Sequence, residues 1–396
     1  MHTTALKTIL SAAFAYCGML LVASTPGSEN ECRAGDCNGP GYWIVSTYSM
    51  PQMPGSNPKC LNFKYYFKPV CGKMRRGTCS EMQQSLNPSA PTCFFIHGSY
   101  VGIDVAIKDA NNTYGWIKKG SPGCPLNLVF LVWPSDENHT GIPTIDVTRS
   151  GIVATQTGIY LAHLIDRIPG HTPICLVGHS HGTRTVAGCL HYRGGGQIYG
   201  VYKGTKNRSR PIRVVFAAAA INHAWMNPNN RYGKALPQID SMLNILNHRD
   251  LALTAYPLVT PSYGRALAKT GITRFDKRQL GDQACKIHEL DATDVIGFRH
   301  SWPNYYGRPE LAKLIAPFVF FSGAPPQGSV MQARSRNRSN GKSYANGSQR
   351  RSNNSANSSV EIELPQPTSE QGEPEKVSSS SELPAPAAHS EQSATR

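Results

Sequence analysis

The stretch from Ile174 to Tyr192 limits what this chain can fold into more than any other part of its sequence. Four apolar residues, Ile174 to Val177, are typical of a strand buried in a parallel sheet, and they lead directly into Gly178-His179-Ser180-His181-Gly182. Thr183 to Tyr192 then forms a helix-compatible segment. A serine between glycines at this spacing is typical of a sharp strand-to-helix turn, where larger residues would clash. The order strand, turn, helix predicts an α/β fold.

Short apolar runs alternate with longer amphipathic stretches along much of the chain, which is the rhythm of a mostly parallel sheet covered by helices. Between the fourth and fifth runs, Gly151–Ile168 has apolar residues at spacings of three and four, which predicts a helix that Pro169-Gly170 ends. We expect an α/β fold with a mostly parallel eight-stranded sheet. Its strands are predicted at Tyr42–Ser46, Leu61–Phe67, Thr92–Ile96, Leu126–Trp133, Pro173–Val177, Ile212–Phe216, Met242–Leu246 and Lys286–Leu290.

The two ends of the chain differ in composition from its middle. Residues 1–25 hold a lysine and then a short apolar run, which is typical of a signal peptide; an uncleaved membrane anchor is the alternative. We therefore expect an exported protein, periplasmic, cell-surface or secreted, with no transmembrane span after processing. Residues 325–396 are rich in Ser, Asn, Gln, Pro and Glu, which predicts a disordered tail. Between them we expect a Cys-rich segment with the first strands at 26–91 and a catalytic core at 92–324.

The number of cysteines also bears on whether the protein is exported to an oxidising compartment. Ten of the 11 lie beyond the leader, and an even number in an exported chain predicts disulfides. Six of them fall between residues 32 and 93, so we expect two or three bridges there. A zinc site is the alternative, but no pair has the Cys-x-x-Cys spacing that presents two thiolates to one metal. We expect no metal and no cofactor.

The charge of the chain is strongly positive, with a formal net charge of +15. The tail at 325–396 contributes little, because it carries eight Lys and Arg against seven Asp and Glu. A basic folded part is compatible with an anionic envelope polymer as a partner, and a merely solubilising surface is the alternative. No nucleic-acid motif is present in the sequence, so we expect no nucleic-acid partner.

A serine hydroxyl is a weak nucleophile at neutral pH unless a histidine accepts its proton and a carboxylate orients that histidine. In folds of this kind the acid follows the serine and precedes the histidine. Asp250 comes directly after the strand Met242–Leu246 and is the expected acid for Ser180, with His248 in the same loop. The alternatives are Asp291 and Asp294 after the last strand, whereas Asp240 precedes its strand and would lie at the wrong end.

The expected base is His300, which follows the last strand and precedes a closing helix predicted at Pro309–Ala316. His288 lies inside a predicted strand, which favours a structural role. His179 and His181 flank the serine and are poorly placed to reach back to it. A metal pair formed by these two histidines is the alternative, although no third ligand has a recognisable spacing.

The expected oxyanion hole comes from two turns. The apolar strand Cys93–Ile96 ends in His97-Gly98-Ser99, where the loop after the third strand supplies one backbone donor. The second donor follows the nucleophile. The N–H groups of Ser99 and His181 are therefore the candidates, each worth on the order of 3 kcal/mol of barrier.

Together these pieces resemble the α/β-hydrolase superfamily, and within it exported bacterial esterase/lipase-like hydrolases of a planctomycete-like group. The resemblance spans residues 92 to about 320 and rests on His97-Gly98, Val129 to Asp136 with its Trp-Pro-Ser, Gly178 to Gly182, Asn247 to Asp250 and His300-Ser301-Trp302. It implies a serine esterase or lipase-like hydrolase with Ser180, His300 and Asp250 as its triad. It also implies a small-molecule or lipid-like ester substrate, an acyl-enzyme and no cofactor. His181 departs from the pattern, because Met, Leu or Gln more often follows the serine.

A catalytically silent scaffold that serves as an envelope binding module is the alternative function, since a fold does not guarantee an activity. The three triad candidates in the expected order favour the enzyme. Two stretches, Asn222–Pro237 and Ala255–Gly281, are expected to shape the substrate pocket.

Overall fold

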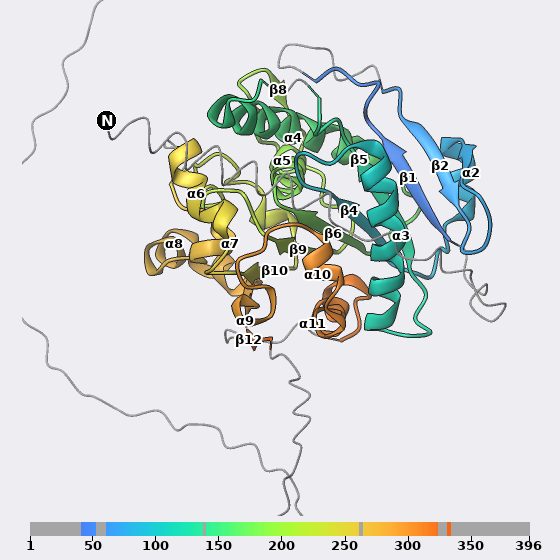
Figure 1. Cartoon of the computed structure of the whole chain (residues 1–396). Helices are drawn as coiled ribbons and strands as arrows, with labels where there is room; N and C mark the ends of the chain where they lie inside the picture. The colour runs from blue at the N-terminus through green and yellow to red at the C-terminus, as the bar shows by residue number, and fades with distance from the viewer. Residues whose placement is uncertain (1–40, 53–60, 138–139, 261–263, 324–330, 334–396) are drawn as a thin grey trace, which may run out of the picture. The chain divides into compact units, whose positions relative to one another are not determined.

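A ten-stranded sheet lies between two layers of helices in the computed structural model of the chain (Figure 1). The structure describes residues 41–52, 61–137, 140–260, 264–323 and 331–333. The expected signal peptide, the cysteines Cys32, Cys37 and Cys60, and most of the expected tail lie outside these residues.

The strand order is β12-β11-β10-β9-β6-β4-β5-β1-β2-β3. Neighbouring strands from β12 to β1 are parallel, and β2 and β3 add an antiparallel edge. The strands of the sheet are β1 Tyr42–Ser46, β2 Lys64–Lys68, β3 Arg75–Gly77, β4 Thr92–Ile96, β5 Asn127–Val132, β6 Ile174–His179, β9 Ile212–Ala217, β10 Ser241–Leu246, β11 Ile287–Asp291 and β12 Met331–Gln332. A separate antiparallel hairpin joins β7 Gln197–Ile198 to β8 Tyr202–Lys203.

All eight predicted strands are present, with ends shifted by up to three residues, but the predicted number of eight is wrong. The strand β3 is three residues of Arg-Arg-Gly at an exposed edge, so it carries no apolar alternation that would reveal it. The strand β12 pairs only Met331 and Gln332 with β11, which also corrects the expectation that all of 325–396 is disordered. Pairings this short depend on the neighbouring strand rather than on their own sequence.

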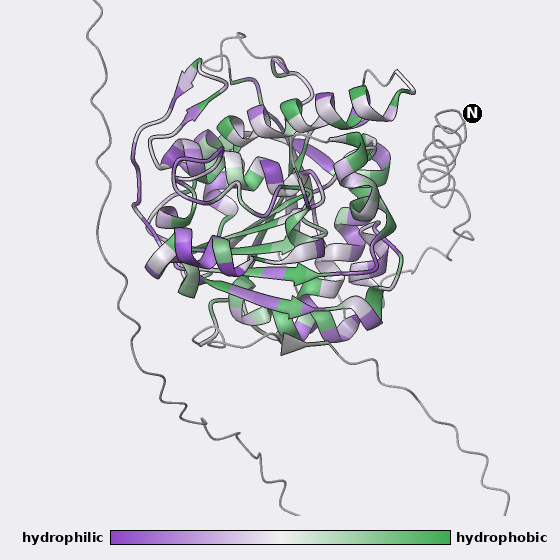
Figure 2. Cartoon of the chain, turned by 90° about the vertical axis from the view of Figure 1, so that its left-hand side faces the viewer, coloured by the Kyte–Doolittle hydropathy of each residue, from purple (hydrophilic) through white to green (hydrophobic). Residues whose placement is uncertain are grey.

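The parallel strands are buried on both faces, which explains their continuous apolar runs. In β4, Phe94 and Ile96 pack into the core on one face, while Cys93 and Phe95 pack into the core on the other. Each large side chain buried in this way contributes roughly 1.5–3 kcal/mol. Figure 2 shows the hydrophobic colour predominating in the inner strands and both colours mixed on the surrounding helices.

The helices α4 and α5 contribute side chains to one of these cores, and α3 and α11 contribute to the other. The helices are α2 Cys79–Ser85, α3 Ile103–Gly120, α4 Pro143–Ile165, α5 Gly182–Arg193, α6 Leu251–Val259, α7 Leu267–Thr270, α8 Arg274–Leu280, α9 Thr293–Ile296, α10 Pro303–Tyr306 and α11 Pro309–Val319. Short 3-10 segments cover Leu236–Gln238 and Gly281–Lys286. The helix predicted at Gly151–Ile168 begins earlier, because Pro143 is favourable in the first turn of a helix.

The described cysteines match only in part the expected disulfides, of which two or three were predicted between residues 32 and 93. Cys71 is disulfide-bonded, but six others are free: Cys79, Cys93, Cys124, Cys175, Cys189 and Cys285. Cys93 and Cys175 lie side by side on β4 and β6 and are fully buried. A buried thiol packs as a small apolar side chain, so an even count of cysteines did not predict their state. No helix within the described ranges is long and apolar enough to cross a membrane.

Candidate active site

Ser180 lies at the carboxyl end of β6, in the sharp turn that leads into α5. Its φ of 51° is in the left-handed region, which is uncommon for a residue with a side chain. The turn is fixed by hydrogen bonds from the Ser180 amide to Ala217 O (2.9 Å) and from the Thr183 amide to Ser180 O (3.0 Å). These two hydrogen bonds hold Ser180 in a left-handed backbone conformation that would be unfavourable in an isolated peptide.

The glycines on either side of Ser180 are required by close approach. A Cβ on Gly182 would lie 2.3 Å from the Ile96 carbonyl oxygen, and one on Gly178 would lie 2.9 Å from the Thr183 amide nitrogen. These contacts are with backbone, which cannot rotate away. The Gly-x-Ser-x-Gly spacing is therefore set by packing against the end of β4 and the start of α5.

The structure brings the three expected residues Ser180, His300 and Asp250 together. His300 Nε2 lies 2.8 Å from Ser180 Oγ, and His300 Nδ1 lies 2.8 Å from Asp250 Oδ2. A carboxylate only accepts, so Nδ1–H donates to Asp250 and Nε2 is left to accept the proton of the serine hydroxyl. This arrangement can generate a nucleophile at Ser180.

Asp250 is fully buried and is held by two donors. It is the N-cap of α6, where Oδ1 accepts the Leu253 amide at 3.0 Å while Oδ2 accepts from His300. The other candidate acids have different partners: Asp291 accepts the Thr293 amide, Asp294 is paired with Arg249 at the surface, and Asp240 accepts from Arg208. Only Asp250 among these four is hydrogen-bonded to His300 in the described residues.

The pKa of His300 is raised above its ordinary value by a balance of two effects. Burial disfavours the charged ring, but the neighbouring Asp250 carboxylate stabilises it by charge and by a hydrogen bond, and the carboxylate prevails. The ring is thus a stronger proton acceptor than an isolated histidine.

Asn247 and His179 fix the loop that carries His300, and the sequence analysis gave neither of them this role. The Asn247 side-chain amide donates to the carbonyls of Gly297 (2.8 Å) and Arg299 (3.2 Å). His179 Nε2 donates to the carbonyl of His300 itself at 2.9 Å. Both side chains follow apolar strands, and their partners are backbone atoms remote in sequence, so only their position at a strand end signalled them.

The expected oxyanion-hole residues lie close to the nucleophile. Gly98 is pressed against it, because a Cβ there would be 2.9 Å from Ser180 Cβ. The amides of Ser99 and His181 donate to no protein group in the described residues. An oxyanion hole requires uncommitted N–H donors of this kind near the reacting hydroxyl.

His97 anchors the loop after β4 to the end of β5. Its Nε2 accepts the Trp133 amide at 3.1 Å, its ring stacks on the indole, and the indole N–H donates to the His97 carbonyl at 2.9 Å. Burial lowers the pKa of His97 to about 4, so the ring is neutral. The resemblance included both residues, and the structure gives them a common structural role.

The histidines that flank Ser180 are neutral as well. Burial, reinforced by nearby positive charge, lowers the pKa of His179 to about 3 and that of His181 well below its ordinary value. His181 Nδ1 is hydrogen-bonded to Ser99 Oγ at 2.5 Å. No group of three or more His, Cys, Asp or Glu side chains in the described ranges is arranged to hold a metal. His288 is buried and packs edge-on against Phe318.

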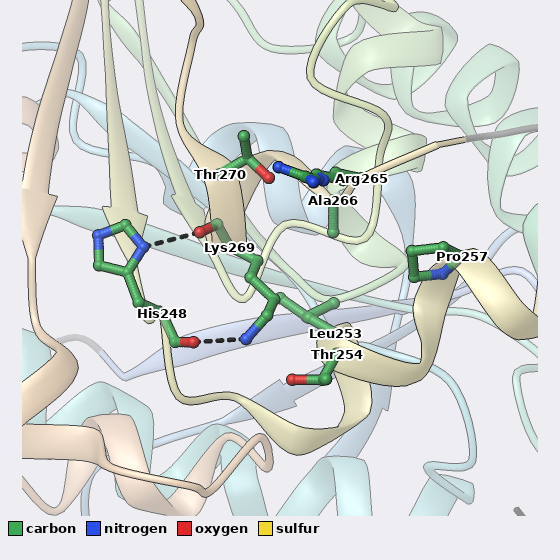
Figure 3. A pocket seen from close by; sticks show the side chains of 8 residues that line it. All are labelled: His248, Leu253, Thr254, Pro257, Arg265, Ala266, Lys269 and Thr270. Carbon is green, nitrogen blue, oxygen red and sulfur yellow. Dashed lines mark hydrogen bonds between the residues drawn. The ribbon is translucent and has the colours of Figure 1, made fainter.

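A hollow of about 310 Å³ lies beside α6 (Figure 3). On one side, His248 Nδ1 donates to the Lys269 carbonyl at 2.7 Å and the Lys269 ammonium donates back to the His248 carbonyl. Part of the stretch that was expected to shape the substrate pocket therefore lines this hollow. The lining residues are His248, Leu253, Thr254, Pro257, Arg265, Ala266, Lys269 and Thr270.

Comparisons with known proteins give only a structural likeness. No protein-family model matches the chain, and no curated protein matches it. The chain is similar to the crystal structure of esterase B from Lactobacillus rhamnosis HN001, with 11% sequence identity, 77% of this chain and 91% of that chain covered, and a TM-score of 0.38. It is also similar to a structure of that esterase inhibited by a C4-C4 SN3 tributyrin phosphonate, with 11% identity, 78% and 90% covered, and a TM-score of 0.39. At these values the likeness carries no function over to this chain.

Proposed function

We propose that this chain is a serine hydrolase of the α/β-hydrolase type that cleaves a carboxylic-ester-type bond. The observation that carries the proposal is the continuous hydrogen-bonded chain from Asp250 through His300 to Ser180, with both distances at 2.8 Å. The left-handed φ of Ser180 supports it, because strain of this kind persists where a function requires it.

In the proposed first half-reaction, Ser180 Oγ attacks the ester carbonyl carbon while His300 Nε2 takes the hydroxyl proton. The carbonyl oxygen becomes an oxyanion that accepts hydrogen bonds from the amides of Ser99 and His181. The oxyanion collapses and breaks the bond to the alkoxide, which takes the proton from His300 and leaves as an alcohol. The acyl group remains bonded to Ser180 Oγ as an acyl-serine. Asp250 orients the imidazole and stabilises its positive charge throughout.

In the second half-reaction water repeats the sequence. His300 takes one proton from the water, the hydroxide attacks the acyl carbon, and the collapse of the second oxyanion breaks the bond to Ser180 Oγ. The proton on His300 returns to that oxygen. The products are a carboxylic acid and the free serine, and no cofactor enters the balance.

The setting of this activity is also part of the proposal. We propose an exported enzyme of the planctomycete-like esterase/lipase group, acting on a small-molecule or lipid-like ester, with a basic surface that suits an anionic envelope polymer. The net charge of +15 supports the last point.

The test is labelling of the oxidised, purified protein with a fluorophosphonate probe. We expect labelling of the wild type and none of Ser180→Ala or His300→Ala. A folded wild type that does not react would contradict the proposal and favour the catalytically silent binding scaffold. Labelling that survives Ser180→Ala would locate the reactive group elsewhere.

A further inference from the structure

The side chains of Ser99 and His181 are hydrogen-bonded to each other at 2.5 Å between Oγ and Nδ1. The same two residues provide the two free backbone amides beside Ser180. Ser99 follows β4 and His181 follows β6, and these strands are neighbours that pair as far as Ile96 and Gly178. Beyond that point β4 and β6 no longer pair, and the side-chain hydrogen bond between Ser99 and His181 links the two turns.

Three other hydrogen bonds of the Ser99 loop run in the opposite direction. His97 is hydrogen-bonded to Trp133, and the amides of Tyr100 and Val101 donate to the carbonyl and the hydroxyl of Ser135. All of these contacts tie the loop to the end of β5. The Ser99–His181 bond ties it to the turn of the nucleophile.

The environment of His181 makes this bond persistent. The residue is 5% exposed, and a buried imidazole that lost its partner would incur a desolvation cost. The ring is neutral, so Nδ1 is a donor in one tautomer and an acceptor in the other, and the hydroxyl of Ser99 can complement either form. The bond therefore survives a change of tautomer.

We propose that Ser99 and His181 act as a positioning pair, whose side-chain hydrogen bond sets the spacing of the two oxyanion-hole amides. This inference rests on the proposed function and gives a role to the histidine that departs from the resemblance. Donors of an oxyanion hole must lie about 2.7–3.1 Å from the developing charge, so a small displacement of one turn weakens catalysis more than substrate binding.

The test uses Ser99→Ala, His181→Leu, the double variant and His181→Asn, which keeps a polar atom near the position of Nδ1. The readouts are kcat and KM for p-nitrophenyl butyrate and the inhibition constant of an alkyl trifluoromethyl ketone, whose hemiketal oxyanion occupies the hole. The matched control is Ser85→Ala, which removes a hydroxyl that accepts the Trp43 indole N–H at 2.8 Å, away from Ser180.

We expect each single variant to lower kcat by on the order of 10-fold and to weaken ketone binding by a similar factor, with KM within about twofold. The double variant should be no worse than His181→Leu, since either change breaks the same bond. His181→Asn should recover part of the loss, and Ser85→Ala should match the wild type.

Fold-losses that multiply in the double variant, or a change in KM without a change in kcat, would overturn the positioning pair. So would an active wild type whose Ser99→Ala variant keeps full kcat and full ketone affinity, and that result would leave the proposed hydrolase intact. A wild type without Ser180-dependent turnover would instead refute the hydrolase, and the positioning pair with it.

Discussion

The described part of this chain contains two histidine–aspartate pairs whose local geometry is nearly the same. His300 Nδ1 lies 2.8 Å from Asp250, and His223 Nδ1 lies 2.7 Å from Asp276. Both carboxylates have no exposed surface, and the histidine side chains are 17% and 23% exposed. Distance and burial alone do not separate a candidate catalytic pair from any other.

The difference lies in what else each pair contacts. His300 presents its second nitrogen to Ser180, while no hydroxyl is hydrogen-bonded to the His223 ring in the described part of the chain. Asp276 is occupied by a capping box with Thr273 and by the Asn227 amide. A histidine–aspartate pair thus gains chemical meaning from the group beyond the histidine, and the pair at α8 holds structure together.

The largest contrast is expected when the histidines themselves are removed. His300→Ala or Ser180→Ala should lower kcat by a factor on the order of 10⁶, because nucleophile and base act as a unit. His223→Ala should leave kcat within about threefold. Steady-state hydrolysis of p-nitrophenyl butyrate measures both, and a comparable loss in His223→Ala would remove the distinction between the pairs.

The next largest contrast is expected between substitutions of the two carboxylates, Asp250 and Asp276. Asp250→Asn is expected to cost roughly 10⁴ in kcat, because the amide no longer holds the correct tautomer of His300, while the helix cap can remain. Asp276→Asn should instead lower the free energy of unfolding by about 2 kcal/mol through weaker charge-assisted hydrogen bonds. Urea unfolding measures the change in the free energy of unfolding, and steady-state kinetics measures the change in kcat, for both variants. An unstable Asp250→Asn with normal kcat would reverse the assignment.

A smaller effect should come from the packing around Ser180. Gly98→Ala places a Cβ 2.9 Å from Ser180 Cβ, so we expect kcat to fall on the order of 100-fold from displacement of the serine. Gly115→Ala in α3 is the control, since nothing lies within 4 Å of its Cβ and the change should stabilise the helix by roughly 0.5–1 kcal/mol. Wild-type kinetics in Gly98→Ala would show that this contact is not tight.

The smallest change is expected in the pH profile. The pKa of His300 is raised, so the ring is protonated and unable to act as a base below a pKa that exceeds 6.5. The acid limb of kcat/KM should accordingly lie above pH 6.5, and it should move to lower pH in Asp250→Asn as the stabilising charge is lost. His223→Ala should not move it. An unchanged limb in Asp250→Asn would mean that another group titrates.

Local patterns allowed much of the fold to be predicted, and long-range contacts account for what was missed. The eight apolar strands and the turn at Ser180 are encoded within a few residues each, so they could be predicted. The pairing of strand β12 and the free thiols of Cys93 and Cys175 depend on residues that are neighbours in space but distant in sequence. The predictions for both were wrong for that reason. Asp250 and His300 could be predicted as candidates from their order along the chain. The roles of Asn247 and His179 could not, because they depend on hydrogen bonds to backbone carbonyls that only the fold brings near.

The loop before His300 is held through its main chain. Asn247 and His179 bind the carbonyls of Gly297, Arg299 and His300, while the side chain of Phe298 is 64% exposed. A side chain that makes no contact needed to hold the loop can be substituted without displacing His300. We therefore expect position 298 to accept substitutions that leave the position of His300 unchanged.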